Sequence, residues 1–167
     1  LRVAGPENFA AVADSDNFSF PGDFTIDIEF AVDEPESEDG QDILTHWGDS
    51  SNQRGYMVRV EADGKPACAW SHDGRDEGIR AIAGETPLEP GRFYKIRVDR
   101  VGGTVRLYVD GHVVAQAADA GTPIMNPNVP IRISGRADGK YGAVAQVRSL
   151  LINHGYALAG SDDGYDV

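Results

Sequence analysis

Three side chains that can form a nucleophilic relay occur side by side in this sequence. Ser71, His72 and Asp73 are consecutive, and consecutive strand residues point to opposite faces of a sheet. They therefore cannot form the serine–histidine–aspartate hydrogen bonds that activate a nucleophile. The sequence also has no G-x-S-x-G motif, which would place a serine on a sharp strand-to-helix turn. We interpret residues 71–73 as a polar turn before Gly74.

A pair of carboxylates offers a second kind of chemistry. Asp27 and Glu29 are two positions apart in an alternating segment, so they share one face of a strand. Glycoside hydrolysis needs two carboxyl groups about 5–10 Å apart with the sugar between them. No other strand carries a marked second pair, so we interpret both residues as solvent-facing acids. We predict that the protein is not an enzyme, and keep a small polysaccharide hydrolase or lyase as the weaker alternative.

Residues that could bind a metal ion are scattered along the chain. The four histidines lack the spacing of a zinc site. The single cysteine, Cys68, excludes an intrachain disulfide and a cysteine-based metal site. Calcium fits better, because it prefers carboxylate and carbonyl oxygens. The candidate calcium ligands are Asp14, Asp16 and Asp49, with the acidic segment 33–42 as a further source of donors. We expect no other cofactor.

The overall charge limits the partners that the chain can have. Fifteen Lys and Arg against 27 Asp and Glu give the 167 residues a formal net charge of −12. Nucleic acid and anionic membrane would both repel such a chain, so we expect neither as a partner. The acid excess favours solubility, with adaptation to salt or cation binding as alternatives. No apolar run approaches the roughly 20 residues that span a bilayer.

Alternation of apolar and polar residues indicates the elements that must position these groups. In residues 23–32 apolar side chains fall at every second position, which is the period of a half-buried strand. About nine or ten such segments, bounded by Gly, Asp, Asn and Pro, follow one another, and no βαβ unit is visible. We therefore predict an all-β antiparallel sandwich. Further strands are expected at 55–62, 65–71, 93–100, 104–111, 112–117, 130–134 and 143–153.

The same alternation predicts which side chains face the core. Gly64 is expected in a tight turn, where it supplies a positive φ. Cys68 shares a face with Trp70, and we expect it to be buried and unreactive. We place Met57 on the outer face. The expected inward residues of two neighbouring regions are Tyr56, Val58 and Val60, and Phe93, Ile96 and Val98.

No linker divides the chain, so we predict a single domain over residues 1–167 with its core at about 9–153. Residues 33–42 and 117–130 are interpreted as loops because they are rich in acids, Pro and Gly. The acidic tail at 160–167 is expected to fray. The start of the sequence shows no signal peptide pattern, and the absence of an initiator Met indicates a trimmed or excised chain.

Several segments, in their order, resemble one family. The opening "FTIDIEF", the later "RLYVDG" and the closing "YGAVAQVRSLLI" are similar to segments of laminin-G-like, concanavalin A-like jelly-roll domains, including those of bacterial surface proteins and phage virion proteins. The resemblance covers roughly residues 9–153. It implies a two-sheet antiparallel jelly-roll sandwich in an extracellular, cell-surface or virion setting. Many such domains carry calcium, but Ala145 and Gln146 stand where the family often has acids, which weakens that expectation.

The segment "GDSSNQRG" contains no apolar residue, so core packing does not explain it. Aromatic faces and planar polar groups in rim loops are typical of sugar sites. We therefore predict a ligand site formed by Trp47, Asn52, Gln53, Arg54 and Tyr141. The alternative for Arg54 is a structural ion pair with the acidic segment 33–42.

Two functions share this fold and this set of residues. The first is a non-catalytic surface-recognition module that binds a glycan or a protein surface. The second is a structural subunit of a virion or surface layer, with no glycan ligand and with assembly into a homo-oligomer or a larger complex. They differ in what the loops touch, so the sequence leaves both open.

Overall fold

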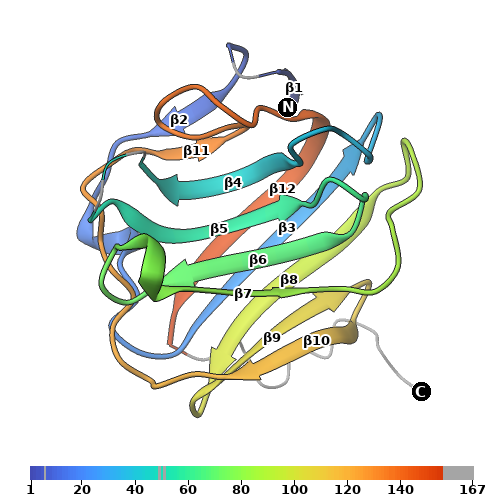
Figure 1. The fold of residues 1–167 in the computed structure, drawn as a ribbon. Helices are drawn as coiled ribbons and strands as arrows, with labels where there is room; N and C mark the ends of the chain where they lie inside the picture. Colours follow the sequence, from blue (N-terminus) through green and yellow to red (C-terminus); the bar gives the residue numbers. More distant parts are fainter. Residues whose placement is uncertain (6, 49, 51, 156–167) are drawn as a thin grey trace.

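The computed structural model describes residues 1–5, 7–48, 50 and 52–155, which form two six-stranded antiparallel sheets packed face to face. The strands of the two sheets cross at an angle in Figure 1. This arrangement confirms the expected all-β jelly-roll sandwich. Sheet A has the order β1-β12-β3-β8-β9-β10, and sheet B has the order β2-β11-β4-β5-β6-β7.

The strand bounds are as follows. In sheet A they are β1 (Arg2–Ala4), β3 (Phe24–Val32), β8 (Tyr94–Val101), β9 (Thr104–Val109), β10 (His112–Ala118) and β12 (Val144–His154). In sheet B they are β2 (Ala10–Val12), β4 (Gln41–Trp47), β5 (Arg54–Val60), β6 (Pro66–Ser71), β7 (Ile79–Ala83) and β11 (Ile131–Ile133). Two short 3₁₀ helices, η1 (Asp16–Phe18) and η2 (Asp76–Gly78), lie in connections. No helix in the described part of the chain is long and apolar enough to cross a membrane.

The core lies between the sheets and is filled by alternate residues of the central strands. Sheet A contributes Phe24, Ile26, Ile28 and Phe30 from β3, all at most 2% exposed. Each such side chain stabilises the fold by roughly 1.5–3 kcal/mol relative to an exposed position. Sheet B contributes Tyr56, Val58 and Val60, with Cys68 and Trp70 beside them. The predicted faces of these strands and the turn at Gly64, whose φ is 81°, are therefore confirmed.

The register of β8 differs from the expected one at its first residue. Tyr94, rather than Phe93, shares the inward face with Ile96 and Val98. Phe93 is half-buried, and the guanidinium carbon of Arg148 lies 3.4 Å from the centroid of its ring. The prediction failed because three apolar residues were grouped without the two-residue period of a strand.

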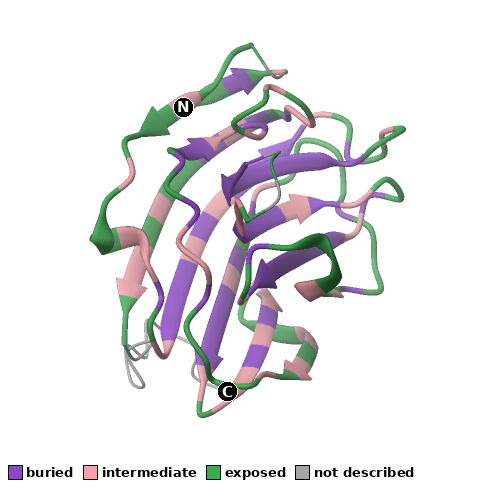
Figure 2. Cartoon of the chain, turned by 60° about the vertical axis from the view of Figure 1, so that its left-hand side comes forward, coloured by how far each residue is buried: buried purple, intermediate pink, exposed green. Residues whose placement is uncertain are grey.

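Sheet B is also buried on part of its outer face, which the sequence did not predict. Met57 is 3% exposed although it points away from the core, and it packs with Trp47 and Ala69 in a second apolar cluster. The cover comes from residues 135–142, which we call the Tyr141 loop. Thr45 Oγ1 donates a 2.8 Å hydrogen bond to Gly135 O, and the backbone N of Ala137 donates to Trp47 O at 3.4 Å. Figure 2 shows buried residues concentrated on the central strands, and exposed residues on turns and edges.

Candidate functional site

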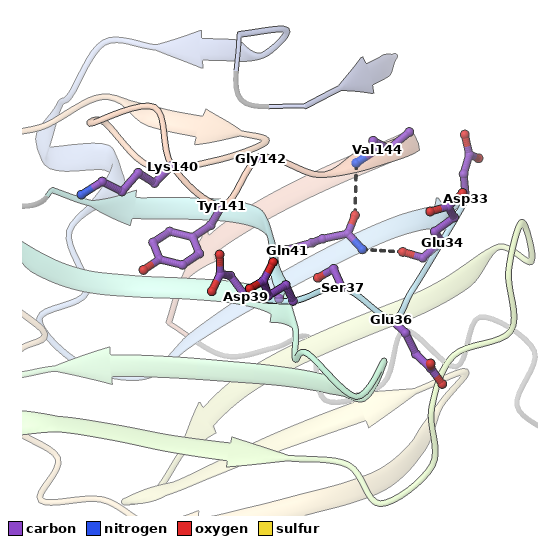
Figure 3. A pocket seen from close by; sticks show the side chains of 12 residues that line it. Asp33, Glu34, Glu36, Ser37, Asp39, Gln41, Lys140, Tyr141, Gly142 and Val144 are labelled. Carbon is purple, nitrogen blue, oxygen red and sulfur yellow. Dashed lines mark hydrogen bonds between the residues drawn. The ribbon is translucent and has the colours of Figure 1, made fainter.

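A cavity of about 650 Å³ opens beside the start of β4. One wall is the segment 33–40, which we call the acidic loop, and the opposite wall is the end of the Tyr141 loop with the start of β12 (Figure 3). Its size falls in the range of roughly 300–1,000 Å³ that is usual for small-molecule sites. The lining residues are Asp33, Glu34, Glu36, Ser37, Glu38, Asp39, Gly40, Gln41, Lys140, Tyr141, Gly142 and Val144.

Gln41 joins the two walls of the cavity. Its side-chain Nε2 donates to Glu34 O at 2.6 Å, and its Oε1 accepts a hydrogen bond of 3.1 Å from the backbone N of Val144 (Figure 3). Because Gln41 is only 5% exposed, these bonds are shielded from competing water. They hold the acidic loop at a fixed distance from β12.

Gly40 makes the sharp entry into β4 possible. Its φ of 77° lies in the left-handed region, which a side chain disfavours. A Cβ atom at this position would lie 2.8 Å from Val60 O and would also collide with the Arg59 guanidinium. Arg59 in turn donates from Nη2 to Asp39 O at 2.9 Å, which fixes the end of the acidic loop.

Tyr141 forms an aromatic wall of the cavity and has an unusual backbone conformation. Its φ of 59° costs of order 1–3 kcal/mol for a residue other than glycine. The structure holds this conformation through a 2.7 Å hydrogen bond from the backbone N of Asp42 to Tyr141 O. The guanidinium carbon of Arg136 also lies 4.0 Å from the centroid of the tyrosine ring. A strained aromatic residue at a cavity wall marks a candidate functional site.

Asp42 lies behind Tyr141 and organises the guanidinium groups around it. Its carboxylate is fully buried, with Oδ2 2.6 Å from Arg136 Nε and Oδ1 3.3 Å from Arg59 Nε. Burial raises the pKa of Asp42, and the positive charges of Arg136 and Arg59 oppose this rise. The two arginines thus compensate one buried acid, and Arg136 is held against the ring of Tyr141.

The charge of the cavity lining is strongly negative. Five lining residues are acidic, whereas Lys140 is the single basic one. Asp33 pairs with Arg2 at 3.1 Å. The side chains of the other acids form no ion pair with any residue that the structure describes; these acids are Glu34, Glu36, Glu38 and Asp39. The Nζ of Lys140 lies 3.2 Å from Asp138 Oδ2, so its charge is shared with an acid outside the lining.

The predicted ligand residues are divided between the cavity and its support. Tyr141 lines the cavity. Trp47 is 3% exposed, and the guanidinium carbon of Arg136 lies 6.0 Å from the centroid of its ring. Trp47 and Tyr141 are therefore connected through one arginine.

Arg54 closes the turn that follows β4. Its Nε donates to Asp76 Oδ1 at 2.9 Å, and its Nη1 donates to the carbonyl oxygens of Gly48 and Ser50. Its ion pair is therefore with Asp76 rather than with the segment 33–42. The remaining two predicted residues, Asn52 and Gln53, lie in the same turn, where the backbone N of Asn52 donates to Gly74 O. Neither of them lines the cavity.

The lining residues Gln41, Glu34, Glu36, Glu38 and Asp39 were not predicted as a ligand site. The acidic composition of 33–42 was a visible signal, but it indicated a loop and a source of calcium donors. The cavity depends on contacts between residues about a hundred positions apart, such as Gln41 with Val144. No local pattern in the sequence reports such contacts.

The predicted calcium ligands lie elsewhere. Asp14 Oδ1 is 3.1 Å from Nε2 of the buried His46, and Asp16 is exposed in η1. Asp49 lies outside the described residues. Among the described residues, no three His, Cys, Asp or Glu side chains are grouped so that they could hold a metal ion. Calcium binding stays a prediction.

The residues considered for catalysis are engaged in structural contacts. Asp27 Oδ1 lies 2.6 Å from Arg97 Nε, and Glu29 Oε1 lies 2.9 Å from Arg148 Nη1. Both pairs are partly exposed, as expected for acids that face solvent.

The segment 71–73 forms the predicted turn. Ser71 Oγ donates to Asp73 Oδ1 at 3.0 Å and accepts a hydrogen bond from the backbone N of Gly74. His72 lies apart from this pair, with its Nε2 2.7 Å from Asp119 Oδ1. The three side chains therefore do not form a relay.

Several solved structures of similar fold are described as binding domains. The botulinum neurotoxin serotype G binding domain superposes with a TM-score of 0.70 at 12% identity, covering 91% of this chain and 38% of that one. The serotype D ligand-binding domain in complex with N-acetylneuraminic acid gives 0.69 at 10% identity, covering 90% and 37%. The carbohydrate-binding module CBM66 from Bacillus subtilis gives 0.54 at 15% identity, covering 87% and 91%.

At these identities the likeness establishes the fold, and the chain spans less than two fifths of the toxin domains. A search among curated proteins gives no match. The family model described as the concanavalin A-like lectin/glucanases superfamily matches residues 5–154, which is most of the chain. The chain therefore belongs to the concanavalin A-like lectin/glucanases superfamily.

Proposed function

We propose that this chain is a non-catalytic recognition module that binds a glycan in the cavity between the acidic loop and Tyr141. The observation that carries the proposal is the aromatic ring of Tyr141, held in a strained conformation at the wall of a cavity of ligand size. Structural stability alone does not account for such strain, because glycine would adopt the same φ at no cost. A role of the ring in binding does account for it.

The chemistry of the lining suits a sugar. The face of Tyr141 offers an apolar surface on which the C–H groups of a pyranose can pack. Carboxylates of the acidic loop accept hydrogen bonds from sugar hydroxyls, and such charge-assisted bonds are stronger than neutral ones. Trp47 and Arg54 act behind this surface: Trp47 packs against Arg136, and Arg54 fixes the turn after β4.

Two related folds support glycan binding as a general function, since CBM66 is a carbohydrate-binding module and the serotype D domain was solved with N-acetylneuraminic acid. At 15% and 10% identity, neither relative carries its particular sugar over to this chain. We place the recognition in an extracellular setting, on a cell surface or a virion. The walls of the cavity are joined by the hydrogen bonds of Gln41 to Glu34 and Val144, and calcium binding stays a separate prediction.

The test is a substitution that removes the ring while relieving the strain. The wild-type protein and Tyr141→Gly are compared on a glycan array, and hits are measured by titration calorimetry. We expect Tyr141→Gly to weaken binding at least tenfold and to leave the melting temperature unchanged or higher.

Phe9→Ala provides the control, because the ring of Phe9 is also covered by an arginine, with the guanidinium carbon of Arg132 3.6 Å from its centroid, and it lies outside the cavity lining. It should leave glycan binding unchanged. The proposal fails if the wild-type protein binds no glycan. The cavity is the wrong site if Tyr141→Gly binds as tightly as the wild type.

A further inference from the structure

We infer that the cavity selects glycans whose sugar units carry a protonated amino group, and that it rejects glycans carrying carboxylates. This inference rests on the proposed glycan site and adds the chemical class of its ligand. The observation behind it is the combination of a small-molecule cavity, an aromatic wall and an uncompensated negative charge.

The acids of the lining keep their charge available for a ligand. Glu34, Glu36, Glu38 and Asp39 make no ion pair with any described residue, and all four are exposed. A cavity concentrates the field of charges along its walls. A sugar ammonium in this field is attracted by several carboxylates at once, whereas a uronate or sialate carboxylate is repelled by them.

The nearby cations cannot reverse this preference. Arg136 and Arg59 both lie against the buried carboxylate of Asp42, and Arg59 is also 3.7 Å from Glu61 Oε2. Lys140 lies beside Asp138. Arginine is the usual partner for a ligand carboxylate because its guanidinium binds both oxygens. Here the two arginines beside the cavity are already occupied by acids of the protein.

The aromatic wall adds to the preference for a cation. An ammonium group within about 6 Å of an aromatic ring centroid is attracted by the negative face of the ring. Arg136 covers one side of Tyr141 at 4.0 Å. The ring lies at the cavity wall, so an amino sugar can be attracted both by the ring and by the carboxylates of the acidic loop (Figure 3).

The experiment uses three trisaccharides of similar size and different charge: a glucosamine trimer, an N-acetylglucosamine trimer and a galacturonic acid trimer. Affinities are measured by titration calorimetry at pH 6, where the amines are protonated, at 50 and 500 mM NaCl. We expect the glucosamine trimer to bind at least tenfold more tightly than its N-acetylated counterpart. The advantage should shrink at high salt, because screening shortens the range of the field to about 3–5 Å. The galacturonic acid trimer should not bind.

A quadruple variant tests whether the acidic loop is responsible. It replaces the four unpaired acids by their amides: Glu34→Gln, Glu36→Gln, Glu38→Gln and Asp39→Asn. The control makes the same change in net charge at exposed acids outside the lining: Glu7→Gln, Glu77→Gln, Glu85→Gln and Glu89→Gln. The loop variant should bind the glucosamine and N-acetylglucosamine trimers equally, whereas the control should keep the wild-type preference.

The possible failures are distinguishable. Equal binding of glucosamine and N-acetylglucosamine trimers by the wild type would overturn the charge selectivity and leave the glycan site intact. Tight binding of the galacturonic acid trimer would likewise overturn the charge selectivity and leave the glycan site intact. If a trilysine peptide binds and no sugar does on the array or by calorimetry, the proposed function itself is overturned.

Discussion

His46 is a titratable side chain inside the sandwich, fully buried between the sheets. Its Nε2 lies 3.1 Å from Asp14 Oδ1, and its ring meets Tyr56 edge to face at 5.3 Å. Burial lowers the pKa of His46, and the nearby charge of Asp14 opposes this effect without reversing it. The folded state therefore favours the neutral ring more than the unfolded state does.

The lowered pKa predicts a loss of stability in mild acid. The unfolded chain binds a proton at His46 near the ordinary pKa of 6.5, whereas the folded chain does so at lower pH. The stabilisation is present above pH 6.5 and is lost as the pH falls below it, by at most about 1.4 kcal/mol per pH unit. Urea unfolding at pH 7.5 and 5.5 should show a smaller change in unfolding free energy between the two pH values for His46→Gln than for the wild type. The control variant His112→Gln, at an exposed position, should behave like the wild type. If the unfolding free energy of His46→Gln changes with pH as much as that of the wild type, the argument is contradicted.

Cys68 illustrates a residue whose environment could be predicted from its neighbours in sequence. Alternation with Trp70 placed it on the core face, and it is 2% exposed. Burial raises the pKa of its thiol to about 12. Because the thiolate is the reactive form, a thiol reagent at pH 8 should label the native protein orders of magnitude more slowly than the urea-unfolded protein. Rapid native labelling would indicate that β6 separates from its neighbours.

At the level of elements, the entry into β4 controls the shape of the cavity. Gly40→Ala would add strain at φ 77° and a collision with Val60 O and the Arg59 guanidinium. Gly91→Ala would add strain alone, because φ is 70° there and no atom lies within 4 Å of the new Cβ. We expect a loss of about 1 kcal/mol in unfolding free energy for Gly91→Ala and about 2–4 kcal/mol for Gly40→Ala. Equal losses would show that the collision is relieved by movement of Arg59.

The strands that the sequence predicts well are those with a clear two-residue period. In β3 every second residue from Phe24 to Phe30 faces the core, and the residues between them are less buried except for Thr25. The edge strands β1 and β2 have three residues each, too few for a period to be recognised. Strand β7 is mostly exposed on both faces, so burial imposes no alternation on it.

The candidate site was less predictable because its parts come from distant segments. Tyr141 could be named as a candidate ligand residue from its aromatic ring and its place in a loop, and it lines the cavity. That Trp47 would be buried under the Tyr141 loop depends on contacts such as Thr45 with Gly135, which are 90 positions apart. Asn52, Gln53 and Tyr141 do lie in connections, whereas Trp47 ends β4 and Arg54 begins β5. Loop conformation and long-range contacts decide which of these residues share a cavity.

At the scale of the whole molecule, buried charges connect the two sheets. Asp119 follows β10, and its carboxylate is completely buried. It accepts hydrogen bonds from Trp70 Nε1 at 3.0 Å in sheet B and from Arg100 Nη1 at 3.1 Å in sheet A, and His72 Nε2 lies at 2.7 Å. Although burial acts in the opposite direction, the hydrogen bonds from His72 and Trp70 lower the pKa of Asp119. This cluster lies apart from the cavity, which does not include any of its members.

Removing this carboxylate should therefore destabilise the sandwich without touching the binding site. In Asp119→Ala the guanidinium of Arg100, which is 1% exposed, keeps its carbonyl partners Gly22 and Thr122 but loses its only neutralising charge among the described residues. Breaking a buried pair in this way costs about 3–5 kcal/mol. Asp27→Ala removes the partly exposed pair with Arg97 and should cost about 0–1 kcal/mol. Urea unfolding followed by tryptophan fluorescence measures both losses.

The stabilisation by Asp119 also depends on pH. Because the pKa of Asp119 is lowered, its contribution is present at neutral pH and disappears as the pH falls below about 4. The wild type and Asp119→Ala should therefore converge in stability at such low pH. A loss below 1 kcal/mol at pH 7 would mean that water replaces the carboxylate and that the cluster does not hold the sheets together.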